Sequence, residues 1–438
     1  MFDDRTVPAP DLGDGVYDQP ATAVVPATAC LLIGLTIAVP IVPEARLTLF
    51  DVIAVILVLR GWRTTMGLFK PAGVILGISA LAMAVSAYLN ESALIALASR
   101  EFQMVALALE MMAYGVLLAE GDDRSRAALA LGVAAGICCH YFYPNDLRVL
   151  DEPIKFLVGI PLGVGLLALL AVAWPRAGAA ALLTFVLMIG YVAFCFLLGS
   201  RSVGGVFFVA AFVTVGIGII KIPRNYRKIA PVLIVVAGLL LYALTEVYAA
   251  LAINGLFGSQ AAGIAAFQSS FGSILLGGRP EVIVNMSGVR DAPFFGVGIL
   301  NYPSIYLYEM VRLSVYSQDL ILDVDNILYH SALFGTAFES GIIAALFWGY
   351  LLYMTLMAVP LLKDASTGQR AFIAPLLLIT TWHILYSPPI AYNRFVMGLG
   401  AAFAIVLYAE WKMRQAAMTE ALDEGDDADV AESYPYRM

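Results

Sequence analysis

The sequence is dominated by apolar runs of about 18 to 25 residues that are separated by short polar breaks. A run of this length, coiled into a helix that rises about 1.5 Å per residue, crosses the roughly 30 Å hydrocarbon core of a bilayer. Hydrophobic residues make up 61% of the chain and charged residues only 13%. Soluble domains are about 45–50% apolar and roughly 25% charged. The pattern therefore excludes a soluble enzyme and predicts an all-α integral membrane protein.

Counting the apolar runs predicts about twelve transmembrane helices. Their expected ranges are 21–42, 47–62, 71–89, 102–119, 126–144, 154–174, 177–199, 203–222, 230–252, 341–361, 371–388 and 394–411. The first run follows neither a positively charged segment nor a clear cleavage site, so we expect a retained span and not a secretory signal. The second run is short and contains Asp51.

The segment 253–340 interrupts the series of apolar runs. It is too long for a connector and too rich in Gly, Asn, Arg and Tyr to face lipid, so we expect a loop domain with short helices of its own. The expected organisation is a tail at 1–20, nine transmembrane helices in 21–252, the loop domain at 253–340, three transmembrane helices in 341–411 and an acidic tail at 412–438. The acidic composition predicts that both tails are disordered.

The distribution of Lys and Arg predicts the orientation of the chain. The short loops on the same side of the membrane as the N-terminus hold more basic residues than the loops on the other side. Both termini are therefore expected in the cytoplasm and the large loop outside. In a bacterial inner membrane the loop would then face the periplasm. The sequence has no long basic run, and we therefore expect no nucleic-acid partner. The four cysteines lie in apolar stretches, as small buried hydrophobes do.

One histidine carries the first candidate for chemistry. If residues 325–347 form one helix that enters the tenth span, Asn326, His330 and Gly341 share a face, and Glu339 points away from it. Two interpretations of His330 stay open. It is either a buried histidine that caps a membrane helix, or a general base at the membrane surface, where an imidazole can accept a proton from a hydroxyl.

The spacing around this histidine resembles a known signature. His330 and Ser331 are followed by nine residues, Gly341, two further residues and the small residue Ala344. This order is similar to the motif of O-antigen ligases and their polysaccharide-polymerase relatives, in which the last position usually holds Gly, Thr or Tyr. Glu339, two residues before the glycine, resembles the Glu-x-Gly of that family. A small residue at the last position still permits close helix packing.

Three further segments extend the resemblance over about residues 148–350. Residues 277–303 resemble the start of the outer loop of the family, with Arg279 followed by an amphipathic helix, Pro293 and the Gly296–Gly298 turn. Residues 198–205 resemble the Ser-Arg at the outer end of a span and assign Arg201. Residues 148–162 are similar to a segment that precedes the sixth span in the ligases. The resemblance implies a GT-C-like bundle with one catalytic periplasmic loop.

The resemblance also implies the reaction. The donor would be a glycan on undecaprenyl diphosphate, and an acceptor hydroxyl of the lipid A-core would attack the anomeric carbon with inversion. Arg201 and Arg279 would hold the diphosphate, and His330 would take the proton of the acceptor. The residues Arg290, Arg394 and Asn326 would support substrate binding. No metal and no cofactor is expected, and the triplet Asp323–Asp325 is interpreted as a helix start.

The motifs leave alternatives open. A ligase and a polymerase that joins lipid-linked repeat units into O-antigen, capsule or exopolysaccharide share this donor chemistry; we favour the ligase because the histidine motif and segment 148–162 resemble ligases most. A transporter or flippase fits the sequence less well. Such proteins often contain an internal repeat, whereas the halves of this chain show none, and the basic residues collect at one surface. Glu110, in the fourth span, is either a proton-relay carboxylate or a helix–helix contact.

Overall fold

The computed structural model of the chain describes residues 24–42, 47–142, 153–173, 179–198, 200–219, 230–270, 279–313, 329–388 and 391–423. The prediction for the tail at 1–20 and for residues 424–438 lies outside the described residues. Residues 412–423 are described and helical, so the prediction of disorder is wrong for them. Asn326 and the Asp323–Asp325 triplet also lie outside them, as does the first part of segment 148–162.

The prediction of an all-α fold is confirmed for the described residues. The α-helices are α1 (Ala27–Leu35), α2 (Leu49–Arg60), α3 (Trp62–Leu89), α4 (Leu94–Glu120), α5 (Asp123–Cys139), α7 (Gly159–Ala173), α8 (Ala179–Leu197), α9 (Arg201–Ile219), α10 (Ala230–Ile253), α11 (Ser259–Ser269), α13 (Pro280–Asp291), α14 (Ser304–Leu313), α16 (Ala332–Ser340), α17 (Leu346–Ala358), α18 (Thr367–Tyr386) and α19 (Ala391–Asp423). The short strands β1 (Pro40–Val42) and β2 (Leu47–Thr48) form an antiparallel hairpin between α1 and α2.

Five helical stretches among the described residues are long and apolar enough to cross a bilayer. They are Trp62–Leu89, Leu94–Glu120, Asp123–Phe142, Leu346–Asp364 and Tyr392–Thr419. Shorter apolar helices cover Ala27–Ala38, Gly159–Ala173, Leu182–Leu197 and Arg201–Ile217. These helices indicate a multi-pass membrane protein. The number of twelve spans and the side on which the large loop lies stay predictions.

The second and third spans were predicted at 47–62 and 71–89, with a polar loop between them. The structure differs there. Helix α2 has only 12 residues, and α3 runs without a break from Trp62 to Leu89, through Arg63 and Lys70. Arg and Lys have high helix propensity, and their long side chains carry the charge to a polar surface while the backbone stays helical. The polar residues therefore extend a helix and do not form a loop.

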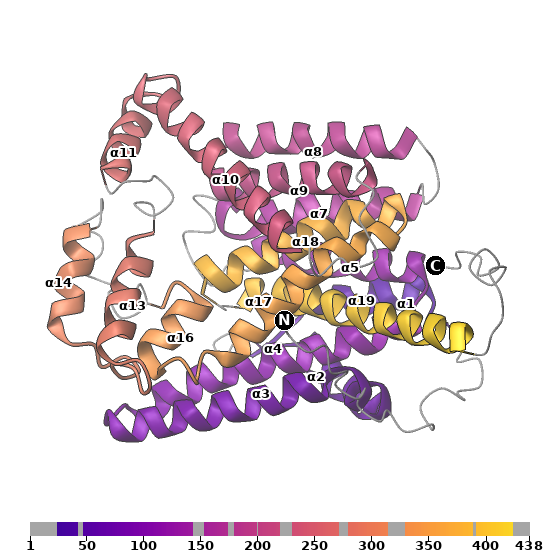
Figure 1. Cartoon of the computed structure of the whole chain (residues 1–438), viewed down its shortest axis with the longest axis horizontal. Coiled ribbons are helices and arrows are strands. Elements are labelled where there is room, and N and C mark those ends of the chain that lie inside the picture. The colour runs from indigo at the N-terminus through magenta and orange to yellow at the C-terminus, as the bar shows by residue number, and fades with distance from the viewer. Residues whose placement is uncertain are drawn as a thin grey trace.

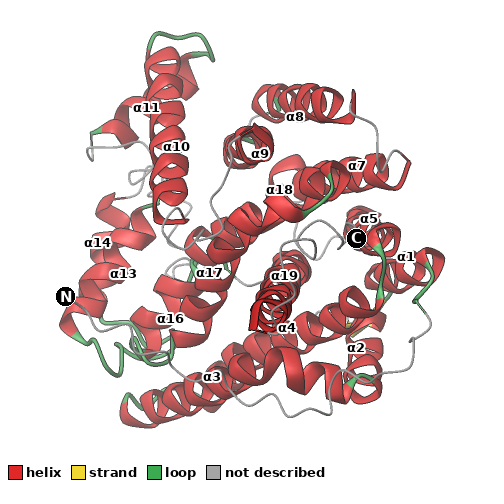
Figure 2. Ribbon diagram, turned by 45° about the vertical axis from the view of Figure 1, so that its right-hand side comes forward, coloured by secondary structure: helices red, strands yellow, loops and turns green. Residues whose placement is uncertain are grey.

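The helices form one bundle with an appendage at one end. Helix α19 contacts α4, α17 and α18, and α18 in turn contacts α7 and α9. Helices α11, α13, α14 and α16, all from the segment 253–340, gather at one end of this bundle (Figures 1 and 2). Helix α16 packs on α13 and on α18, so it joins the appendage to the bundle.

Candidate functional site

The two motif segments that the sequence singled out lie against each other. The turn that contains Gly296–Gly298 runs beside the end of α16 and the residues that follow it, although more than thirty residues of chain separate the two. Their backbone hydrogen bonds are Val297 N to Phe338 O at 2.9 Å, Gly298 N to Glu339 O at 3.0 Å and Ile342 N to Pro293 O at 2.9 Å. The arginine-led element and the histidine motif therefore form one structural unit.

Two glycines make this contact possible. Gly296 has a φ angle of +62° and Gly341 one of +88°, in the region that side-chain-bearing residues rarely adopt. A Cβ atom at position 341 would lie 2.0 Å from the carbonyl oxygen of Phe294, and one at 296 would lie 2.4 Å from backbone atoms of Glu339. Both the backbone conformation and the lack of space therefore require glycine in these two motif positions.

The expected helix through His330 and Gly341 is wrong. Helix α16 begins at Ala332, and the Ser331 hydroxyl oxygen caps it by accepting a hydrogen bond from Phe334 N at 2.9 Å. The helix ends at Gly341, whose positive φ breaks it before α17 begins at Leu346. A good N-cap residue and a left-handed glycine are stop signals that outweigh the apolar periodicity. His330 thus precedes the helix and shares no helical face with Gly341.

Arg279 and His330 both lie at the C-terminal end of α18. Arg279 is the N-cap residue of α13, and its guanidinium lies over the ring of Trp382, 5.6 Å from the ring centroid. Ala332 N donates to Ser387 O at 3.1 Å, which fixes the residues just after His330 to the same helix end. The tertiary structure thus brings together the regions of the predicted phosphate-binding arginine and the predicted base.

A buried ion pair connects this unit to the membrane bundle. The Arg100 Nε and Nη2 atoms each donate to one oxygen of Glu339 at 3.0 Å, and the two side chains are 7% and 1% exposed. Tyr302 also donates to Glu339, through its hydroxyl. The Arg100 guanidinium lies 3.6 Å above the ring of Tyr329, the residue before His330. Arg100 therefore contacts both ends of the histidine motif.

The tyrosines of this unit stay neutral donors. Burial raises the pKa of Tyr302 well above its ordinary value, and the negative charge of Glu339 raises this pKa further. Burial likewise raises the pKa of Tyr329, while the nearby Arg100 opposes the shift. A neutral phenol keeps its proton for the hydrogen bond to Glu339. The charges of the buried cluster are thus limited to one guanidinium and one carboxylate.

Arg201 and Arg290 take different positions. Arg201 begins α9, and its guanidinium lies 4.9 Å from the ring centroid of Tyr248, near the end of α10. Arg290, in the last turn of α13, is 78% exposed and lies 3.4 Å from an oxygen of its neighbour Asp291. Arg290 can therefore meet only a ligand that approaches from the surface of the appendage.

Arg394 lies inside the bundle, between two carboxylates. Its Nη2 donates to Asp51 at 2.9 Å, and its Nε lies 2.5 Å from Glu110 Oε1 in a charge contact without hydrogen-bond geometry. The arginine is 2% exposed, and its partners come from α2 and α4, whereas Arg279 lies against α18. Of the two interpretations of Glu110, the helix–helix contact is the one seen. The charge of Arg394 is paired with the carboxylates of Asp51 and Glu110. Its role in substrate binding stays a prediction.

The candidate residues chosen from the sequence include none of Arg100, Trp382 and His383. Arg100 stands at the start of the fourth predicted span, on the side where the orientation rule disfavours arginine, and this position was the available signal. Trp382 gave no comparable signal, because tryptophan is common at membrane interfaces. His383 stands at the outer end of a predicted span, which by itself is a weak signal. Among the described residues no three His, Cys, Asp or Glu side chains are grouped as metal ligands.

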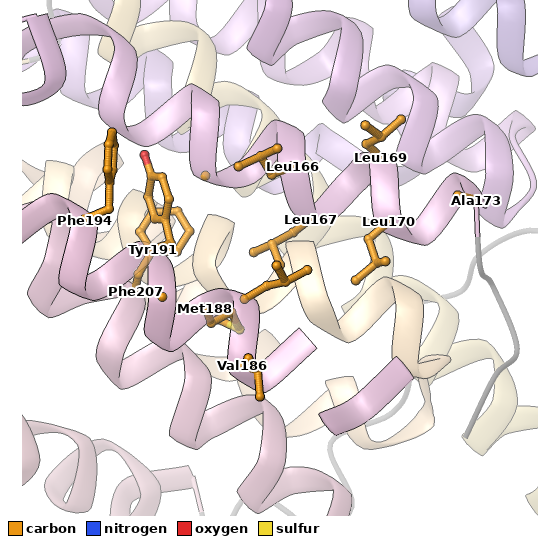
Figure 3. A pocket seen from close by; sticks show the side chains of 13 residues that line it. Leu166, Leu167, Leu169, Leu170, Ala173, Val186, Met188, Tyr191, Phe194 and Phe207 are labelled. Carbon is orange, nitrogen blue, oxygen red and sulfur yellow. The ribbon is translucent and has the colours of Figure 1, made fainter. Parts of the chain in front are cut away.

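An apolar crevice of about 650 Å³ lies between α7, α8 and α9 (Figure 3). Its lining includes Leu166, Leu170, Met188, Tyr191 and Phe207. The one hydroxyl, that of Tyr191, donates to the carbonyl oxygen of Gly159. This lining offers no charge and few hydrogen-bond partners, so it suits hydrocarbon and not a glycan or a phosphate.

Comparison with known proteins adds no relative. No family model, no curated protein and no solved structure matches this chain.

Proposed function

We propose that this protein is a membrane glycosyltransferase of the O-antigen ligase kind, which transfers a glycan from undecaprenyl diphosphate to a hydroxyl of the lipid A-core at the outer face of the inner membrane. One observation carries the proposal. Arg279 and the residues that follow His330 lie at the same end of α18, although the chain between them passes through α13 and α14. A cation for the leaving group and a base for the nucleophile are the two groups that the reaction needs.

The arginine acts on the leaving group. When the bond between the anomeric carbon and the diphosphate oxygen breaks, the electron pair stays on the diphosphate and its negative charge grows. A guanidinium can hold two phosphate oxygens at once and stays charged at any physiological pH. Arg279 is only partly exposed and pairs loosely with Glu281, at 3.4 Å, so most of its donors remain for a ligand. Arg201 serves as a second clamp in this proposal.

The histidine acts on the acceptor. The acceptor hydroxyl attacks the anomeric carbon from the face opposite the diphosphate, and His330 takes the hydroxyl proton as the new C–O bond forms. The product is the inverted glycoside, with the proton on His330 and the lipid diphosphate released. Since Arg100 lies over Tyr329 and holds Glu339, it keeps the chain on both sides of α16 in place for this step.

Replacement of single residues in cells tests the assignment. We expect His330→Ala and Arg279→Ala to abolish glycan transfer while the protein still inserts into the membrane. Suitable controls are His140→Ala and the exposed Arg312→Ala, which should both transfer glycan normally. The ring of His140 bonds to Ile37 O and packs on Tyr392, both within the bundle. Full transfer by either His330→Ala or Arg279→Ala would overturn the mechanism.

A gene deletion separates the ligase from the polymerase. Loss of a ligase leaves long glycan chains on the carrier lipid and none on lipid A-core. Loss of a polymerase leaves single repeat units. Gels of the surface glycan and of the lipid-linked pool distinguish the two. Single repeat units in the deletion strain would assign the protein as a polymerase and not as a ligase.

A further inference from the structure

A second histidine lies at the same end of α18 as Arg279 and His330. His383 is only 4% exposed, and neither of its ring nitrogens has a hydrogen-bond partner within the described residues. An imidazole always carries at least one N–H donor, and buried donors are nearly always paired in folded proteins. The two unpartnered ring nitrogens therefore indicate that a ligand forms hydrogen bonds with His383.

The groups around His383 favour an anion. Trp382, His383 and Tyr386 lie on one side of α18, by the three- and four-residue spacing of a helix, and the Arg279 guanidinium lies over Trp382. Helix α13 begins directly after Arg279 with Pro280 at its first position, so the positive end of this helix lies at Arg279. The carboxylate of Glu281 pairs with Arg279, with its Oε1 3.4 Å from Arg279 Nη1.

The polar groups at the start of α16 do not bond to the imidazole of His383. Ala332 N is bonded to Ser387 O, and the Ser331 hydroxyl is within 3.4 Å of Ile384 O, so the polar groups that α16 brings to this end of α18 meet the backbone and not the ring. Among the described residues, the unpartnered imidazole of His383 thus lies next to Trp382, the residue over which the Arg279 guanidinium lies.

We propose that His383 and Arg279 together bind the phosphate oxygens of a prenyl diphosphate, the imidazole N–H and the guanidinium each donating to them. The assignment rests on the proposed function for the identity of the ligand and adds a residue to its site. Arg279 stacks on Trp382, and His383 supplies a second, buried donor that holds the anion against the helix end. His330 remains the base toward the acceptor.

Binding of a glycan-free probe to the full-length protein in detergent tests this assignment. Farnesyl diphosphate is titrated by calorimetry, and the fluorescence of Trp382 reports on binding beside Arg279. We expect His383→Leu to raise the Kd about tenfold or more, because it removes a hydrogen bond to a charged ligand. His383→Gln, which keeps an N–H donor, should recover part of the affinity, and inorganic pyrophosphate should bind more weakly than the lipid.

The controls separate a binding role from a structural one. His140→Leu removes another buried histidine, paired with Ile37 O at 2.8 Å, and should leave the Kd unchanged. The proposal is overturned if wild-type protein does not bind farnesyl diphosphate, or if His383→Leu binds it as tightly as wild type while Arg279→Ala does not. Binding that depends on His383 together with normal glycan transfer by His330→Ala would keep this inference and refute the proposed reaction.

Discussion

Arg100 and Glu339 form a two-bonded ion pair that joins α4 to α16, with both N–O distances at 3.0 Å. The pair is enclosed, since the carboxylate also accepts from Tyr302 and the guanidinium covers the ring of Tyr329. Such a pair specifies how the appendage sits on the bundle, because each charge is stable in the interior only beside the other.

Removal of either partner should destabilise the protein strongly. Arg100→Ala or Glu339→Ala leaves one buried charge without its partner, which costs about 3–5 kcal/mol, and the double variant Arg100→Leu/Glu339→Leu should lose less than the sum of the two. Unfolding free energies in mild detergent measure this. The pair of the exposed Arg60 with the half-buried Glu120, at 3.7 Å, is the control, since Arg60→Ala should cost about 1 kcal/mol or less. Equal losses at both pairs would contradict the argument.

Substitution of Gly341 by alanine should break the contact between the two motif segments. The new Cβ would meet Phe294 O at 2.0 Å and would also sit at a strained φ of +88°, so we expect a loss of about 3 kcal/mol or more. In Gly349→Ala, within α17, the Cβ meets no atom within 4 Å, and stability should stay the same or rise slightly. Similar thermal stability of the two variants would show that the tight turn is not required.

The cluster of Arg394 with Asp51 and Glu110 gives a third prediction. Arg394→Gln leaves two buried carboxylates close together without a cation, and we expect a loss of about 3–5 kcal/mol in unfolding free energy. Adding Asp51→Asn and Glu110→Gln to this variant should recover much of the loss. Arg414→Gln, which removes loose ion pairs to Asp364 at 3.9 Å and to Glu410 at 3.7 Å, should have little effect, because the arginine is exposed to solvent. Failure of the triple variant to recover would point to packing and not to charge.

The contribution of Tyr302 to stability should depend on alkaline pH. The pKa of this phenol in the folded protein lies above its ordinary value of 10, so folding favours the protonated form. The stability that Tyr302 adds is therefore fully present below pH 10 and is lost as the pH rises toward the folded-state pKa. We expect Tyr302→Phe to be less stable than wild type at neutral pH and the difference to shrink above pH 10. A difference that is constant over this range would rule out the linkage.

Local features of the fold could be predicted from the sequence, and partners distant in sequence could not. The apolar runs predicted helices, and helices occupy these runs, because a backbone in an apolar medium has to satisfy its hydrogen bonds within the segment. The same logic failed at Ser331 and Gly341. The apolar periodicity predicted one continuous helix through both positions, whereas the Ser331 cap begins α16 and the positive φ of Gly341 ends it. It also failed at Arg63 and Lys70, which are helical and not in a loop.

The sequence by itself determined the apolar helices and the Gly296–Gly298 turn, since each depends on neighbours a few positions away, and it named Arg279 and His330 as candidate residues. Only the tertiary structure decided that Arg100 binds Glu339, that Arg394 is held between Asp51 and Glu110, and that Arg279 lies over Trp382, next to His383. These contacts depend on the rotation and crossing of helices far apart in the chain. Those angles follow from the packing of the whole bundle, and no local pattern encodes them.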